Sequence, residues 1–279
     1  MLIDTHAHLN FDAFKNDYDK VIEDCLKNDI WVINIGTNFK SSKRAVEISE
    51  NYEKGVFASI GLHPINLDTD LVKMKVDKSE GSHFEKEFDY QKYKNLAKSK
   101  KVIAIGEIGL DYYYRPKTKR KKELFKQKQK DLLLKQIKLA EELNLPIIFH
   151  CRMAHNDLIE ILNYELKTKN YQLKGVMHGF VGVKEQLKKY LEMGFYIGFN
   201  GIIFKSIEGI SFEENIKETP IEKILIETDC PFLNPIKKEE RNTSLNLKYI
   251  VKKIAEVKNL NFEKIAKQTT ENAKKLFKI

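Results

Sequence analysis

The side chains that could bind a metal ion or transfer a proton recur at one kind of place in this sequence. Histidine, glutamate and aspartate residues end short apolar runs, or follow them closely, in six separate stretches of the chain. Of the seven histidines, only His83 and His155 lie elsewhere, where we expect surface residues. One such histidine alone would be explained as a hydrogen-bonded structural residue. Because the placement recurs, we treat as one candidate set His6, His8, His63, Glu107, His150, His178 and Asp229.

The spacing of His6 and His8 indicates that they share a ligand. Residues two positions apart in a β-strand point to the same side, so two imidazoles at this spacing can bind one ion. His150 and His178, on neighbouring predicted strands, could bind a second ion. A carboxylate of the set that bridges both ions would hold them about 3.5–4 Å apart, as in two-metal hydrolytic sites.

Such a pair of ions would lower the pKa of a bound water and hold the attacking and leaving oxygens of a hydrolytic reaction. Mixed imidazole and carboxylate ligation suits Zn²⁺, Mn²⁺ or iron, whereas Mg²⁺ prefers oxygen ligands. The residue types therefore predict two divalent cations but do not choose the metal.

The elements that must position these residues alternate along the chain. Continuous apolar runs, as expected of strands covered on both faces, predict eight strands at 2–5, 31–35, 56–60, 102–105, 146–149, 175–177, 195–198 and 224–227. Apolar residues spaced three to four apart predict helices at 17–28, 41–51, 90–99, 124–143, 156–167, 184–192, 245–257 and 262–277.

This alternation predicts an α/β fold, a single TIM-like (β/α)8 barrel over residues 1–279 with its metal site at the carboxyl ends of the strands. Two connections look enlarged, at 66–89 and 111–123. Loops that follow barrel strands lie on the catalytic face, so both could border a substrate cleft. For 66–89 we favour a surface insertion without a role.

The composition, with 42% hydrophobic and 32% charged residues, allows a substantial core and excludes global disorder. A net charge of +9 is typical of attraction to a polyanion, or only of a lysine-rich surface. Three cysteines without a CxxC pair fit a reducing compartment. Because no signal-like segment or membrane-length apolar run is present, we expect a cytoplasmic protein, with the nucleus as the alternative in a eukaryote, and no membrane or obligate protein partner.

Several segments together resemble the TatD family of metal-dependent deoxyribonucleases, in the amidohydrolase superfamily. They are IDTHAHL at 3–9, GLHP at 61–64, GEIGLDY at 106–112, HCRMA at 150–154, HGF at 178–180, ETDCP at 227–231 and RN at 241–242. The DxHxH pattern alone indicates only the superfamily. The segments around Glu107 and Asp229, in this order, are far more specific.

The resemblance implies a role for each member of the set. His6 and His8 would hold one metal with Asp229 beside it, and His150 and His178 would hold the other. Glu107 would bridge the two ions. The resemblance also implies Mg²⁺ as the metal.

The resemblance further implies Mg²⁺-dependent 3′→5′ exonucleolytic cleavage of DNA, with a preference for single strands. Asp229 would be the base that deprotonates the attacking water. His63 would contact the scissile phosphate or protonate the leaving oxygen. Arg152 could pair with a phosphate through a charge-assisted hydrogen bond.

Two positions depart from the family pattern. Family members usually carry a second histidine after the proline of the GxHP segment, where this chain has Ile65, so Asn66 is a candidate substitute. The usual Glu-Pro after residues 241–242 is replaced here by Thr243 and Ser244, which changes no proposed ligand.

Aromatic and basic residues follow the fourth predicted strand. Tyr112 and Tyr113 open a tyrosine run that is followed by lysines and arginines as far as Lys130. Stacking on aromatic rings and cations along the backbone are the ingredients of single-strand binding, so we predict that these tyrosines contact DNA at a single strand or 3′ end. The alternative is a solvated helix start with the tyrosines packed beneath it.

Two other functions remain open from the residues. An amidohydrolase-type enzyme could use the same ligands on a small molecule or an acyl ester such as an aminoacyl-tRNA. A non-catalytic nucleic-acid-binding barrel is less favoured, because every proposed ligand is present. Salt-sensitive binding of oligonucleotides would separate the first alternative from a nuclease.

Overall fold

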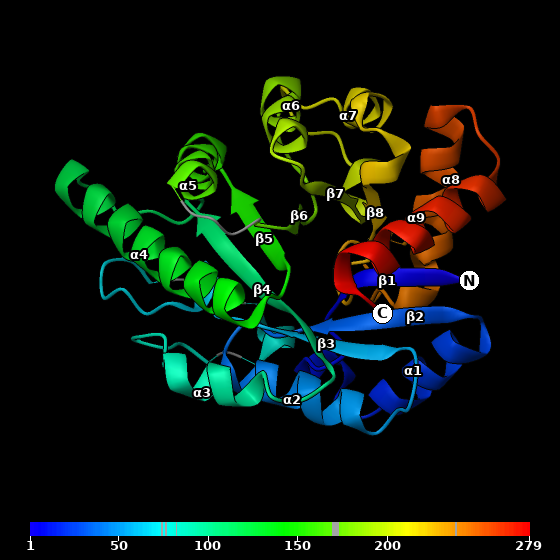
Figure 1. Ribbon diagram of the computed structural model, residues 1–279, viewed down its shortest axis with the longest axis horizontal. Helices are drawn as coiled ribbons and strands as arrows, with labels where there is room; N and C mark the ends of the chain where they lie inside the picture. The colour runs from blue at the N-terminus through cyan, green and yellow to red at the C-terminus, as the bar shows by residue number, and fades with distance from the viewer. Residues whose placement is uncertain (74, 76, 82, 169–172, 238) are drawn as a thin grey trace.

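Eight parallel strands curve into a nearly closed barrel in the computed structural model, which describes every residue except 74, 76, 82, 169–172 and 238 (Figure 1). Each strand pairs with the next along the chain, and the predicted TIM-like fold is confirmed. The strands are β1 Leu2–Ala7, β2 Ile30–Ile35, β3 Val56–Ile60, β4 Val102–Asp111, β5 Ile147–Arg152, β6 Gly175–Met177, β7 Tyr196–Phe199 and β8 Ile224–Ile226.

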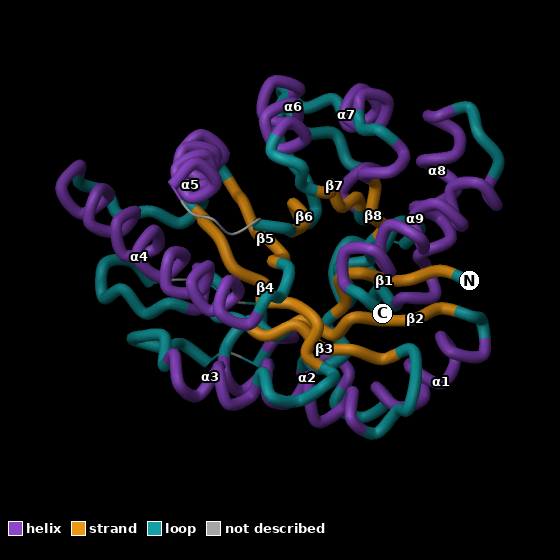
Figure 2. The backbone as a smooth tube through the Cα atoms, in the orientation of Figure 1, coloured by secondary structure: helices purple, strands orange, loops and turns teal. Residues whose placement is uncertain are grey.

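The helices lie outside the curved sheet, between successive strands and after the last one (Figure 2). They are α1 Tyr18–Lys27, α2 Phe39–Glu50, α3 Tyr90–Leu96, α4 Lys119–Leu143, α5 His155–Thr168, α6 Lys184–Glu192, α7 Phe212–Glu218, α8 Leu247–Lys258 and α9 Phe262–Phe277. In the part of the chain that the structure describes, none of these helices could span a membrane.

The fourth and fifth strands are longer than the sequence predicts, and this extension carries the site. Apolar patterning stops at Ile105, where two glycines and a glutamate follow, but β4 continues to Asp111 by pairing with β5. At Gly109 a Cβ atom would lie 1.9 Å from the carbonyl oxygen of His150. Only glycine allows that close approach, so Gly109 is what lets the two strands stay paired.

Helix α7 is not among the predicted helices, because a seven-residue helix has too few turns for its apolar spacing to be distinctive. Its start is nevertheless marked in the structure. The side chain of Ser211 accepts a hydrogen bond from the backbone of Glu214, as an N-cap does.

The expected surface position of His155 is wrong. This first residue of α5 is only 7% exposed. Its Nδ1 lies 3.0 Å from the Tyr190 hydroxyl, and its Nε2 lies 2.8 Å from the carbonyl oxygen of Val181. Because both ring nitrogens have hydrogen-bond partners, the imidazole can be buried at a low cost in free energy.

The barrel interior is apolar near the amino ends of the strands, where Ile3, Ile33 and Ile148 pack together. Leu276 and Phe277 at the end of α9 belong to the same cluster. Asn272 of α9 also donates to the carbonyl oxygens of Ile221 and Ile224, both at 2.8 Å. The last helix therefore closes the end of the barrel opposite to the polar site.

We expect Leu276→Ala to lower the free energy of unfolding by about 2–5 kcal/mol, because the leucine is buried and its loss leaves a cavity. Urea denaturation followed by circular dichroism measures the change. Lys267→Ala on the exposed face of the same helix is the control and should stay within about 0.5 kcal/mol of wild type. Equal effects of the two substitutions would show that α9 does not close the barrel.

Candidate metal centre

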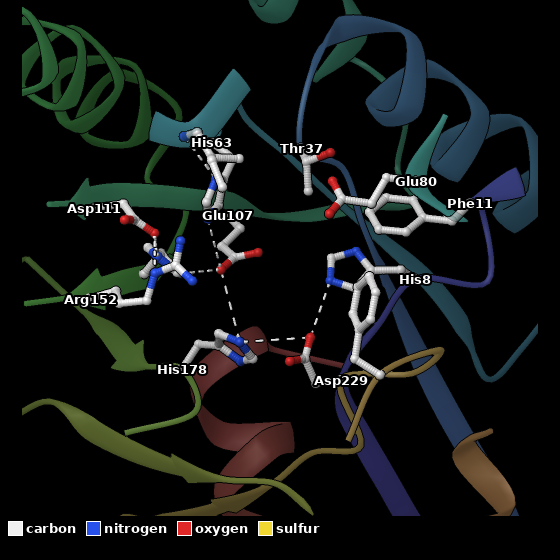
Figure 3. A pocket seen from close by; sticks show the side chains of 13 residues that line it. His8, Phe11, Thr37, His63, Glu80, Glu107, Asp111, Arg152, His178 and Asp229 are labelled. Atoms are coloured by element: carbon white, nitrogen blue, oxygen red, sulfur yellow. Dashed lines mark hydrogen bonds and ion pairs between the residues drawn. The ribbon is translucent and has the colours of Figure 1, made fainter. Parts of the chain in front are cut away.

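A polar cavity of ≈ 200 Å³ opens at the carboxyl ends of the strands (Figure 3). Most of the candidate set lines it, and His6 lies beside it with no exposed surface. The residues of the predicted site that line the cavity are His8, His63, Glu107, His150, Arg152, His178 and Asp229. The structure thus brings together side chains that are spread over more than two hundred residues of sequence.

His6, His8 and Asp229 form one group of possible ligands at the junction of β1 and β8. The two Nε2 atoms are 3.2 Å apart, and Oδ1 of Asp229 lies 3.4 Å from that of His8. His8 Nδ1 lies 3.1 Å from the carbonyl oxygen of Ile35, which requires the proton on Nδ1. Nε2 of His8 is therefore the nitrogen that faces the centre of the group and that a metal ion could bind once any proton on it is lost.

Glu107 lies between the two halves of the site. Its Oε1 is 2.7 Å from His150 Nδ1 and 3.9 Å from His178 Nε2, while its Oε2 is 3.4 Å from His6 Nε2. Burial would raise the pKa of this carboxyl, but His63, His6 and the bond to His150 hold it well below its usual range. An ionised carboxylate with one oxygen towards each imidazole group is suited to bridging two cations.

The second half of the site differs in one respect from the expected pairing of His150 with His178. Distances group His63, Glu107 and His150, whereas His178 Nε2 lies 3.9 Å from both Glu107 and Asp229, between the two halves. The Nδ1 atom of His63 accepts a hydrogen bond from the backbone of Ile65 at 3.0 Å. Since burial lowers the pKa of His63, the ring is neutral and its proton is on Nε2, which makes it a donor rather than a ligand.

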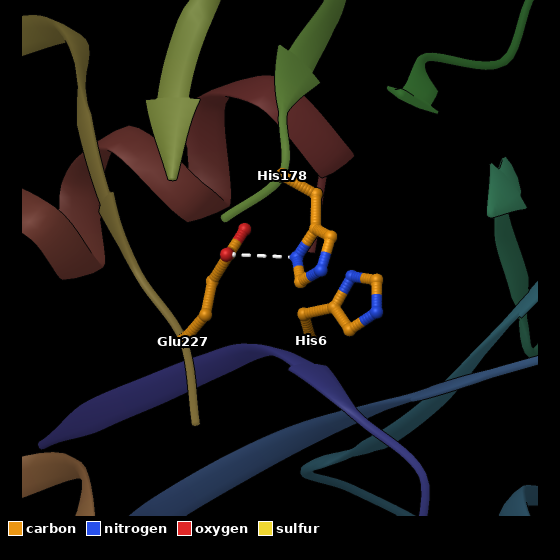
Figure 4. A group of neighbouring side chains, drawn as sticks. All are labelled: His6, His178 and Glu227. Carbon is orange, nitrogen blue, oxygen red and sulfur yellow. Dashed lines mark hydrogen bonds and ion pairs between the residues drawn. The ribbon is translucent and has the colours of Figure 1, made fainter. Parts of the chain in front are cut away.

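Glu227 orients His178 from outside the cavity (Figure 4). Its Oε2 accepts hydrogen bonds from His178 Nδ1 and from the backbone of Gly179, both at 2.9 Å. Distances alone would count His6, His178 and Glu227 as a third ligand group. Because Glu227 contacts the nitrogen that faces away from Asp229 and Glu107, we assign it to holding the ring, not to a metal.

Asp111 holds the opposite wall of the cavity. Its side chain is fully buried at the end of β4, and its Oδ2 accepts a hydrogen bond from Arg152 Nε at 2.7 Å. The same oxygen lies 3.0 Å from His150 Nε2. The Arg152 guanidinium also stacks on the Tyr113 ring, 4.4 Å from its centroid. These contacts fix Arg152 at the edge of the site.

Of the other residues predicted to contact substrate, Tyr113 is 55% exposed, beside Arg152. Tyr112 is 5% exposed, and its hydroxyl donates to Asp157 at 2.9 Å. Asn66 is 1% exposed and donates to the Thr37 carbonyl at 3.0 Å. The structure does not bring Asn66 to the cavity, because the backbone after His63 turns its side chain into the protein.

The segment 66–89 does reach the site, contrary to the role-free insertion that the sequence favoured. Glu80 of this segment lines the metal cavity, and burial raises the pKa of its carboxyl to about 7. It is placed there because the short helical turn Lys78–Glu80 packs against the turn Asp12–Phe14. No local pattern marks Glu80, whereas Asp111 could have been found from its even spacing to Glu107 had the strand been extended.

Comparison with known proteins shows the family of this chain. The sequence model described as TatD-related DNase matches residues 3–278. This chain belongs to the TatD-related DNase family. Family and fold therefore stand as the sequence predicted.

Relatives in the family carry mostly general names. A Bacillus subtilis protein named as an uncharacterized metal-dependent hydrolase, YabD, is 39% identical over all of both chains. A Pantoea ananatis protein named as the 3′-5′ ssDNA/RNA exonuclease TatD is 30% identical over 99% of each chain. The crystal structure of the Escherichia coli TatD homologue YjjV aligns over 100% of this chain and 98% of its own, with a TM-score of 0.80 and 25% identity. The chain is thus a metal-dependent hydrolase by family.

We expect Glu227→Gln to weaken binding of a divalent cation by about 10–100-fold, because residues that orient a metal-binding histidine have effects of this size. Titration calorimetry on the metal-free protein measures the affinity. Glu222→Gln, at an exposed position before β8, is the matched control and should bind as wild type does. Wild-type affinity in Glu227→Gln would show that its bond to His178 has no part in the site.

Metal binding should release protons and strengthen as the pH rises. Burial lowers the pKa of His150 and His178, but the facing carboxylates outweigh it and raise these pKa values to about 9 and about 10. Cations must displace those protons, so affinity should rise between about pH 6 and 9, up to tenfold per unit for each proton lost. Without metal, these shifts stabilise the fold at low pH, and that contribution disappears as the pH rises through the raised values.

Calorimetry in buffers of different ionisation enthalpy counts the released protons directly. An affinity that does not change over this pH range, with no proton release, would contradict the prediction. It would mean that both imidazoles are already neutral in the metal-free protein.

Proposed function

We propose that this protein is a metal-dependent deoxyribonuclease that removes nucleotides from the 3′ end of single-stranded DNA. The observation that carries the proposal is the convergence of Glu107 and Asp229 with five imidazoles beside Arg152. The ligand chemistry fits two divalent cations, which when bound would acidify a water molecule and neutralise phosphate charge. Mg²⁺ is the metal that the family resemblance favours.

The chain's own residues supply the remaining steps of hydrolysis. Asp229 is positioned to accept a proton from the attacking water, since the imidazoles around it hold its pKa below the usual range despite burial. His63, with its proton on Nε2, can donate to the leaving oxygen. Arg152, with Nε held by Asp111, presents its guanidinium to a phosphate.

Several features favour a nucleic acid over a neutral ester as substrate. Arg152 stands at the cavity edge with Tyr113 exposed beside it, and α4 begins with four basic residues in succession. The chain carries a net charge of +9. Two relatives named as 3′-5′ ssDNA/RNA exonucleases are 30% and 29% identical to this chain. An acyl ester or small amide remains the competing substrate class, because the same ligands could hydrolyse it.

We expect Mg²⁺-loaded wild type to remove a 3′ label from single-stranded DNA at once and to shorten 5′-labelled strands progressively. Glu107→Ala and Asp229→Asn should each lower the rate by about 10²–10⁴-fold, because each removes a group used in the transition state. Glu47→Ala on the exposed face of α2 is the control and should digest DNA at the wild-type rate.

Digestion at the wild-type rate by both site variants would overturn the mechanism. If wild type left DNA intact but hydrolysed an aminoacyl ester in a Glu107-dependent reaction, the alternative function would replace the proposed one. Binding of an oligonucleotide that weakens steeply with added salt would favour the nuclease.

A further inference from the structure

A second cavity opens beside the metal centre, and Arg152 lines both of them. The second cavity has a volume of ≈ 660 Å³, against ≈ 200 Å³ for the metal cavity. Pockets that hold small organic molecules span about 300–1,000 Å³. The metal cavity therefore has room for ions and a phosphate, and a nucleoside attached to that phosphate must lie outside it.

The walls of the second cavity come from the loops after β4, β5, β6 and β7 and from parts of α4, α5 and α6. They include the carboxylates of Asp157 and Glu208 as well as cationic and apolar side chains. One part is apolar, with Met153 after β5, Val181 after β6, and the bridged pair Ile207 and Ile210 after β7. Lys126 of α4 also lines it, 5.1 Å from the centroid of the Tyr112 ring. Apolar surface for a base and cations for phosphates are the two requirements of a nucleotide site without strict sequence preference.

Met153 is exposed to solvent and has a backbone conformation that methionine rarely adopts. Its side chain is 60% exposed, and its backbone φ is 56°, in the left-handed region that disfavours methionine and suits asparagine or aspartate. Contact between water and an exposed apolar side chain is unfavourable. A flat apolar ligand that covers Met153 would remove this apolar surface from water, and the flexible side chain can adapt to the ligand.

We propose that the second cavity binds the base and sugar of the nucleotide whose phosphate is hydrolysed. The base lies against Met153 and the neighbouring isoleucines, and the phosphate extends past Arg152 into the metal cavity. The inference rests on the proposed function and deepens it, because it names where the nucleoside sits. Contact with Met153 is by dispersion rather than hydrogen bonding, so this wall accepts any of the four bases.

The test compares two ligands that differ only in the base, deoxyadenosine 5′-monophosphate and 2-deoxyribose 5-phosphate. Titration calorimetry with Mg²⁺-loaded wild type should show about tenfold or tighter binding of the nucleotide, since stacking of one base contributes at least this much. In Met153→Asn the ratio of the two affinities should fall towards one. Asparagine is uncharged and tolerates the left-handed backbone, so the variant should fold with an unchanged or higher melting temperature.

Leu134→Asn is the matched control, because Leu134 is 38% exposed on α4 and is not part of the cavity. It should keep the wild-type ratio. The inference is overturned if the base adds no affinity in wild type, or if Met153→Asn keeps the wild-type ratio. Digestion of DNA by the same wild-type preparation is scored separately. If the affinity ratio depends on the base but DNA is not cleaved, the second cavity binds a nucleoside and the proposed nuclease function is rejected. If DNA is cleaved but the ratio does not depend on the base, the nuclease function stands and the inference about the second cavity is rejected.

Discussion

The site depends on keeping the Glu107 carboxylate ionised although it has almost no access to water. Glu107 is 4% exposed, and burying an unpaired negative charge costs several kcal/mol. Imidazoles delivered by four different parts of the barrel surround it and hold it ionised: His6, His63, His150 and His178. Without cations this arrangement raises the pKa of two of the imidazoles. With cations bound, Glu107 and the imidazoles of His6, His150 and His178 would serve as ligands, while His63 would keep its proton on Nε2.

Barrel closure makes that arrangement possible. Asp229 donates its backbone N–H to the carbonyl of His6, which joins the end of the chain's eighth strand to its first. Two further buried carboxylates hold side chains of the site in place: Glu227 orients His178, and Asp111 holds Arg152 and His150. Apolar side chains and the end of α9 fill the other end of the barrel. The packed, apolar end of the barrel thus fixes the strands whose carboxyl ends carry the side chains of the site.

Family membership accounts for the hydrolytic core, and we infer that loop residues beside this core select the substrate. Glu80 narrows the cavity from one side, and Arg152 separates it from the larger cavity beside Met153. Of the substrate contacts predicted from the sequence, Tyr113 and Arg152 lie where a nucleic acid strand could meet them. Asn66 does not, because its amide is used inside the protein. We therefore infer that side chains outside the metal centre, rather than the metal ligands, select the substrate.

The sequence by itself determined the barrel and the candidate metal set, because apolar runs, helical spacing and strand-end histidines are local patterns. The extension of β4 to Asp111 escaped it, since strand pairing across Gly109 is a contact with another strand. Glu80, the inward turn of Asn66 and the burial of His155 were decided by tertiary structure. Each depends on which distant segment packs against the residue: the turn at 12–14, the carbonyl of Thr37, and Tyr190. A local pattern carries no information on such partners, and so the loop residues that border the metal cavity could be identified only from the tertiary structure.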